Sequence, residues 1–206
     1  EAYTSPLVQE TLMWIEQEAG SVRLLSREEV EQPKELLIAA RDSEAVLLVG
    51  GDPLAATTHV SLRLQCREAG VTCRVVHNAS VLTAVAGELG LQHYRFGPVA
   101  TLVLPEGKYK PLSPAKQVLQ NLELGFHSLV LLDIHADDPT AEPRLMTAHE
   151  GAALLQDGEV LPKTLACAAA RVGRSDQKLW AGSLGEMPQT DLGQTPHSLI
   201  IPGKLH

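Results

Sequence analysis

The chain has 206 residues, of which 44% are hydrophobic and 20% charged, as in ordinary globular proteins. Its formal net charge of −8 disfavours a nucleic-acid partner, and its 3% aromatic content disfavours base stacking on single strands. The three cysteines form no C-x-x-C pair, so we expect neither a zinc site nor a disulfide framework, and we expect a cytoplasmic compartment. No apolar run is long enough to predict a membrane span.

Strands and helices are predicted to alternate along the chain. Apolar spacing, caps and glycine stops predict helices at Pro6–Ala19, from Ser26, and at Thr58–Ala69, Ser80–Leu89, Pro114–Leu124 and Thr147–Leu155. Short apolar runs predict strands at Val22–Leu25, Ala45–Val49, Cys73–Val76, Ala100–Leu104, Ser128–Leu132, Thr164–Ala169 and His197–Ile201. Trp180–Met187 is expected to be a short helix or an extended piece. This alternation predicts an α/β fold of two domains with mostly parallel sheets, residues 1–97 and 98–206.

The most informative segment runs from Leu47 to His59. An apolar strand is expected to stop at Gly50-Gly51, after which Asp52-Pro53 turns the chain toward small residues and hydroxyls. Open α/β sheets bind small molecules at the carboxyl ends of their strands. An Asp-Pro dipeptide alone would be read as an ordinary turn. The glycines before it and the small residues after it favour a binding site with Asp52 at its tip.

Other strand ends carry similar loops. Ser80, after the strand Cys73–Val76, is equally compatible with helix capping and with a ligand contact through backbone amides. Leu132-Asp133 and Val172-Gly173 follow two further strands, and a lone histidine such as His197 more often has a structural role. The sequence contains no G-x-S-x-G, P-loop or G-x-G-x-x-G motif. These loops predict a cleft for a cofactor that brings its own reactivity, with no metal site and no assigned catalytic acid or base.

Several stretches resemble the diphthine synthase family, the methyltransferases of diphthamide biosynthesis that are related to the tetrapyrrole methylases. The match runs in order along the whole chain, and its motifs are E-A-Y-T-S (Glu1–Ser5), S-R-E-E-V-E (Ser26–Glu31), G-D-P-L-A-A-T-T-H (Gly51–His59), H-N-A-S-V (His77–Val81), L-L-D-I (Leu131–Ile134), A-R-V-G-R-S-D-Q-K (Ala170–Lys178) with the following A-G-S-L, and H-S-L-I-I-P-G-K-L-H (His197–His206). G-D-P alone would indicate only the superfamily, but the combination of motifs is much more specific.

The resemblance implies a tetrapyrrole-methylase-like fold with S-adenosyl-L-methionine in the cleft between the two domains, and a homodimer. Carried over position by position, it places the cofactor contacts at Asp52, Ala55, Ser80, Val81, Leu132, Val172 and His197. Family members begin with a strand that would precede Glu1 and continue past His206, so we expect the sequence to be a fragment.

The function that the resemblance implies is methylation of the amino-carboxypropyl-histidine intermediate on translation elongation factor 2, with S-adenosyl-L-homocysteine as the product. The substrate amine is expected to attack in its neutral form, and the number of methyl groups stays open between three and four. Alternatives are a tetrapyrrole or corrin methyltransferase, a nicotinamide-dependent enzyme, which the missing glycine fingerprint disfavours, and a non-catalytic fragment that binds S-adenosyl-L-methionine.

Overall fold

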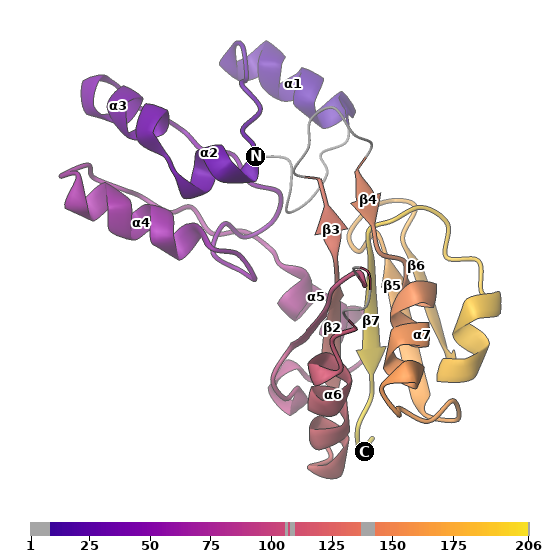
Figure 1. The fold of residues 1–206 in the computed structure, drawn as a ribbon. Helices are drawn as coiled ribbons and strands as arrows, with labels where there is room; N and C mark the ends of the chain where they lie inside the picture. The colour runs from indigo at the N-terminus through magenta and orange to yellow at the C-terminus, as the bar shows by residue number, and fades with distance from the viewer. Residues whose placement is uncertain (1–8, 106, 108–109, 137–142, 206) are drawn as a thin grey trace. The chain divides into compact units, whose positions relative to one another are not determined.

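The chain forms two compact units (Figure 1). A computed structural model describes residues 9–105, 107, 110–136 and 143–205. One unit comprises Glu1–Ser80 with His135–Arg144, and the other comprises Val81–Ile134 with Leu145–His206. This division differs from the boundary after residue 97, because α5 (Val81–Glu88) packs on the sheet of the second unit. The boundary at residue 97 stays a prediction about folding domains.

The first unit is mainly helical, with α1 (Gln9–Ala19), α2 (Arg27–Glu31), α3 (Lys34–Asp42) and α4 (His59–Glu68). The predicted capping box of α2 is present, since the Ser26 hydroxyl accepts from the Glu29 amide and the Glu29 carboxylate accepts from the Ser26 amide. The motif Glu1–Ser5 and the start of the first predicted helix, residues 6–8, lie outside the described residues.

Three strands predicted for the first unit are wrong. Val22–Leu25, Ala45–Val49 and Cys73–Val76 carry no strand assignment in the described part of the chain. Val46 and Val76 are 70% and 73% exposed. A strand is stabilised by a hydrogen-bonded neighbour and a covered face, and apolar composition alone supplies neither. The described strands that reach this unit are the short β3 (Ile134–His135) and β4 (Arg144–Leu145), which form a two-stranded sheet.

The second unit contains a five-stranded sheet in the order β1-β2-β7-β5-β6. The strands are β1 (Ala100–Leu102), β2 (Ser128–Leu132), β5 (Leu165–Ala170), β6 (Lys178–Ser183) and β7 (His197–Ile201). Only β1 and β2 pair in parallel, whereas the other three pairings are antiparallel. The expected α/β class is confirmed, but the expectation of mostly parallel strands is corrected here. The loop between β5 and β6 is too short for a parallel crossover, which takes a dozen or more residues.

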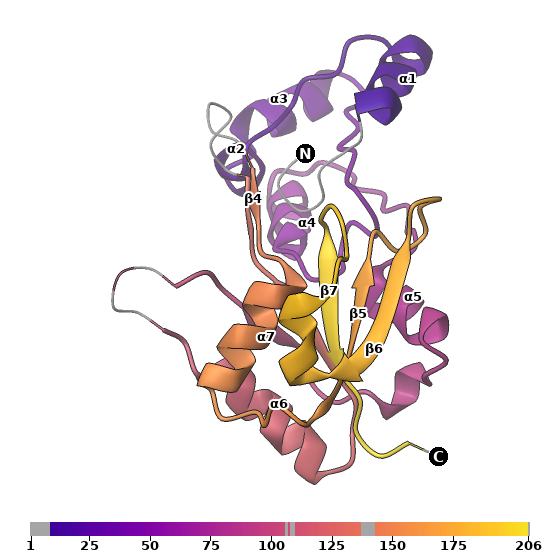
Figure 2. The same ribbon diagram turned by 90° about the vertical axis from the view of Figure 1, so that its right-hand side faces the viewer.

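Helices cover both faces of this sheet, as Figure 2 shows. On one face α6 (Ser113–Glu123) and α7 (Ala148–Asp157) pack on alternate strand residues such as Val130, Ala168 and Leu199. On the other face α5 packs on the intervening residues, among them Leu129, Ala169 and Ile200. These side chains are at most 1% exposed. The two-residue period of the strands therefore gives the unit two hydrophobic layers.

Most predicted elements of this unit are confirmed. The strands β2 and β7 have the predicted bounds, and α5, α6 and α7 lie within two residues of theirs. The segment Trp180–Met187 contains both alternatives, because β6 continues into the 3-10 helix η2 (Leu184–Gln189).

Candidate cofactor-binding loops

In the first unit, Asp52 joins two loops, residues 50–56 and residues 77–80. Its Oδ1 accepts the Leu54 amide at 2.9 Å, and its Oδ2 accepts the His77 Nδ1–H at 2.8 Å and the Asn78 amide at 3.3 Å. Gly51 has a φ of 91°, and a Cβ at this position would lie 3.4 Å from the Ala79 carbonyl oxygen. The loops therefore approach closely where glycine supplies the left-handed backbone conformation.

These hydrogen bonds stabilise the ionised form of the Asp52 carboxyl. The Leu54 amide first, and then His77, lower the pKa of the Asp52 carboxyl below its usual value. The ionised carboxylate only accepts hydrogen bonds, so the proton of the shared bond lies on Nδ1 of His77. The Nε2 atom of that imidazole then carries the lone pair. The His77 side chain is 67% exposed, whereas that of Asp52 is 14% exposed.

The other two predicted positions of this unit flank the same loops. The Ala55 amide donates to the Asp52 carbonyl oxygen at 3.2 Å, which closes the turn that follows Gly51. Ser80 stands directly before the first residue of α5, where a capping residue belongs. The structure thus brings Asp52 and Ala55 together in one turn, and Asp52 contacts the loop that contains Ser80.

In the second unit, Leu132 and His197 lie at the same end of the sheet. The antiparallel pairing of β2 and β7 sets Val130 opposite Leu199, so two further steps bring Leu132 level with His197. Leu132 packs closely on α7, because a Cβ at Gly151 would lie only 2.7 Å from its Cδ2. These two predicted positions therefore lie at one end of the sheet, and their contact with a cofactor stays a prediction.

His197 is held by hydrogen bonds inside the second unit. The Ala148 amide donates to its Nδ1 at 3.2 Å, so the proton is on Nε2, which donates to the Gln194 carbonyl oxygen at 3.1 Å. Burial is the largest influence on its pKa and lowers it, so the imidazole is neutral. With both ring nitrogens engaged, the side chain has the structural role that a lone histidine most often has.

Val81 and Val172 belong to the opposite face, where both pack on the cluster around Val85. The loop of Val172 is linked to α5, because Gln177 accepts the Gly173 amide at 2.7 Å and donates to the Glu88 carboxylate at 2.5 Å. The four predicted positions of this unit are therefore divided between the two faces of one sheet.

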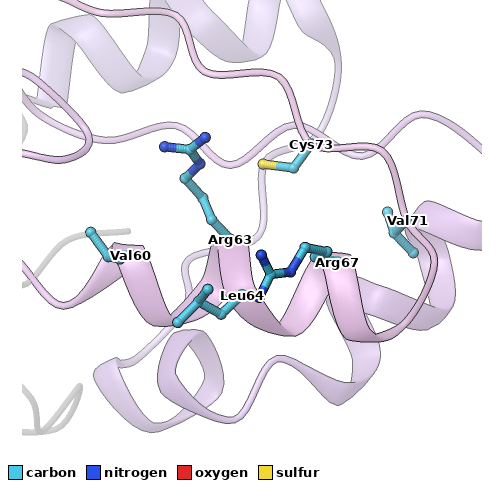
Figure 3. A pocket seen from close by; sticks show the side chains of 6 residues that line it. All are labelled: Val60, Arg63, Leu64, Arg67, Val71 and Cys73. Atoms are coloured by element: carbon cyan, nitrogen blue, oxygen red, sulfur yellow. The ribbon is translucent and has the colours of Figure 1, made fainter.

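A pocket of about 430 Å³ lies on the surface of α4, and none of the predicted cofactor contacts lines it (Figure 3). Its lining combines apolar side chains with two cations and a thiol: Val60, Arg63, Leu64, Arg67, Val71 and Cys73. The described residues contain no group of three or more His, Cys, Asp or Glu that could hold a metal ion.

Comparisons with known proteins identify the family. The model of the Tetrapyrrole (Corrin/Porphyrin) Methylases matches residues 4–188. A diphthine synthase of Methanocaldococcus jannaschii is 38% identical over 215 residues, which cover the whole chain and 82% of that protein. A diphthine methyl ester synthase of Schizosaccharomyces pombe is 36% identical, over 99% of this chain and 78% of that protein. The chain belongs to the diphthine synthase family.

Solved structures agree with this family. A crystal structure of diphthine synthase superposes with a TM-score of 0.82 at 29% identity, over 95% of this chain and 75% of that chain. The expected resemblance and the tetrapyrrole-methylase-like fold are confirmed. The cofactor contacts expected from diphthine synthases stay predictions.

Two residues of this diphthine synthase family member were missed by sequence reasoning. The sequence assigns His77 no role beyond its place in the motif H-N-A-S-V, although its neighbour Ser80 belongs to a candidate loop. Arg171 is buried with a φ of 52°, and its guanidinium donates to Asp176 and to the carbonyls of Leu192 and Gln194. The Arg and Asp of A-R-V-G-R-S-D were a usable signal, because a buried guanidinium requires partners for its five donors.

Proposed function

We propose that this protein methylates the amino-carboxypropyl-histidine intermediate on translation elongation factor 2 during diphthamide biosynthesis. The observation that carries the proposal is the similarity to diphthine synthases, at 36–38% identity over nearly the whole chain. The family model adds that the chain is a methyltransferase. The chemistry of the loops agrees, because they offer backbone groups, one carboxylate and apolar side chains rather than a nucleophile.

S-adenosyl-L-methionine is the proposed cofactor, bound by Asp52, Ala55, Ser80, Val81, Leu132, Val172 and His197. When bound, it supplies an electrophilic methyl group on a sulfonium and leaves as S-adenosyl-L-homocysteine. The described residues suit it, because the ionised Asp52 matches its positive charge and the left-handed backbone at Gly51, with a φ of 91°, turns the chain there without a side chain. Leu132, Val81 and Val172 add apolar surface that excludes water from a reacting centre.

The chain's own residues work mainly by positioning. Asp52 fixes the relative placement of its two loops through three hydrogen bonds. His197 fixes the start of α7 and the turn at Gln194 inside the second unit. Rigid loops lower the entropic cost of aligning an amine with a methyl group, which is a large part of catalysis in bimolecular transfers.

The remaining partners follow from the same proposal. Elongation factor 2 is the protein substrate, the active form is a homodimer, and the reaction takes place in the cytoplasm without nucleic acid or membrane. Within the described residues, no helix combines the length and apolar character that a bilayer span requires.

The test is transfer of labelled methyl groups from S-adenosyl-L-methionine to elongation factor 2 that carries the unmethylated intermediate. We expect incorporation with the wild-type protein, and mass spectrometry of the product counts three or four methyl groups. No transfer to the elongation factor, with turnover on a porphyrinoid instead, would show that the chain is a tetrapyrrole methylase. Binding of S-adenosyl-L-homocysteine without transfer to either substrate would indicate a non-catalytic protein.

A further inference from the structure

The proposed reaction has a proton requirement that positioning alone does not meet. An α-amine titrates near pH ~8, so it is largely protonated at neutral pH and has no lone pair for attack. Each methyl transfer makes the nitrogen cationic again, so a proton has to leave before every transfer up to the third. A nearby base that is neutral at physiological pH would meet this requirement.

His77 has the geometry of such a base. Its Nδ1–H donates to Asp52 Oδ2 at 2.8 Å, which orients the ring and leaves the lone pair of Nε2 directed away from the carboxylate. Asp52 is itself held by the amides of Leu54 and Asn78. This is the base-and-orienter half of a catalytic triad, built on two loops that also carry three proposed cofactor contacts, Asp52, Ala55 and Ser80.

Three other histidines are buried, in contrast to His77. His59, His127 and His197 are 4%, 3% and 7% exposed. His127 Nδ1 accepts the Gly203 amide at 2.9 Å, and both nitrogens of His197 are engaged. His77, by contrast, is 67% exposed with a carboxylate on one nitrogen. Within the described residues, the charged Asp52 contacts the ring of His77 at 2.8 Å, and the adjoining Asn78 and Ala79 are uncharged.

We propose that Nε2 of His77 is the proton acceptor for the substrate ammonium, an inference that rests on the proposed function. The N–H bond of the ammonium breaks, its electron pair stays on the amine nitrogen, and the proton moves to Nε2. The amine then forms the N–C bond while the C–S bond of the sulfonium breaks and its electron pair goes to sulfur. The exposed imidazolium returns its proton to solvent before the next cycle.

Two substitutions separate a base from a merely structural histidine. His77→Ala removes both the base and the hydrogen bond to Asp52, whereas His77→Gln keeps an N–H that can donate to Asp52 but has no basic nitrogen. We expect kcat of both variants to fall about 10²-fold at pH 7, with the loss shrinking above pH ~8, where the free amine deprotonates by itself. Calorimetry should show cofactor affinity within about twofold of wild type for His77→Gln.

Chemical rescue gives the sharpest contrast. Because the side chain is exposed, added imidazole should restore part of the kcat of His77→Ala in a concentration-dependent way. His93→Ala, an exposed histidine of the other unit, is the matched control and should keep wild-type kcat without responding to imidazole. Nitrogen-15 chemical shifts of the isotopically labelled His77 side chain in the wild-type protein should report the Nδ1–H tautomer, independently of activity.

These outcomes decide whether His77 is a base or a structural contact between the two loops. If His77→Gln has the kcat of the wild-type protein, the proposal is overturned and His77 is only a loop contact. The same conclusion follows if added imidazole does not raise the kcat of His77→Ala. A wild-type rate in both variants also overturns the proposal, while transfer by the wild-type protein keeps the proposed function. No methyl transfer by the wild-type protein would reject the proposed function, and the role of His77 with it.

Discussion

The two units position their candidate residues by different means. In the second unit the positions stand on a hydrogen-bonded sheet with a helix layer on each face, and its central side chains are fully buried. In the first unit the described buried residues are few, namely Val30, Pro33, His59 and Cys66. There the loops depend on the hydrogen bonds of one carboxylate, Asp52. Substitutions in the second unit should therefore cost global stability, and those in the first unit should cost ligand affinity.

The largest expected effect on stability comes from the central strand. Leu199 of β7 is 0% exposed, and Leu199→Ala should lower the free energy of unfolding by about 3 kcal/mol because it leaves a cavity. Val76→Ala in the first unit, where the side chain is 73% exposed, is the control and should change it by less than about 0.5 kcal/mol. Denaturant unfolding measures both, and equal losses would contradict the contrast between the units.

The next effect concerns ligand affinity. Asp52→Ala should weaken S-adenosyl-L-methionine binding about tenfold or more, because two loops lose their shared acceptor. Methyl transfer should fall as a consequence. Calorimetry measures the affinity, with Asp157→Ala, another carboxylate in an ion pair, as the control. Unchanged affinity in the Asp52 variant would show that its assignment as a cofactor anchor is wrong.

A smaller effect is expected in the pH dependence of stability. Burial lowers the folded-state pKa of His197 below 6.5, so the unfolded chain binds a proton that the folded chain does not. Stability from this group is therefore complete above pH 6.5 and is lost as the pH falls through that value. His197→Gln keeps one hydrogen-bond acceptor and one donor but has no titrating group. The free energy of unfolding of this variant should therefore fall less between pH 7 and pH 5.5 than that of the wild-type protein. Parallel thermal unfolding curves for both proteins across this range would contradict the prediction.

The smallest effects compare two equivalent helix caps. Ser26 and Thr147 each form a capping box, with Glu29 and Glu150 respectively. Replacing either hydroxyl residue with alanine should destabilise its helix by about 1 kcal/mol. We expect Thr147→Ala to lower the global stability of the second unit, since α7 packs on its core, and Ser26→Ala to raise hydrogen exchange only around α2. Global destabilisation by Ser26→Ala would indicate that the first unit is more cooperative than its burial suggests.

Local patterns were enough for several parts of this structure. The bounds of β2 and β7 followed from apolar runs, and the starts of α2 and α7 followed from hydroxyl caps. The positive φ of Gly70, Gly90 and Gly125 agrees with their assignment as helix stops. Each of these signals depends on residues a few positions apart, so the sequence contains them completely.

Sequence motifs also determined the family and the loops of interest, because G-D-P-L-A-A-T-T-H and H-N-A-S-V are contiguous. Tertiary structure decided which strands pair and which unit α5 joins, since these depend on contacts between segments far apart in the chain. It likewise decided that the three segments predicted as strands in the first unit form no assigned strand. It alone placed His77 on Asp52, twenty-five positions earlier, where a shared proton orients an exposed imidazole. No local pattern encodes that contact, because it exists only when the two loops meet.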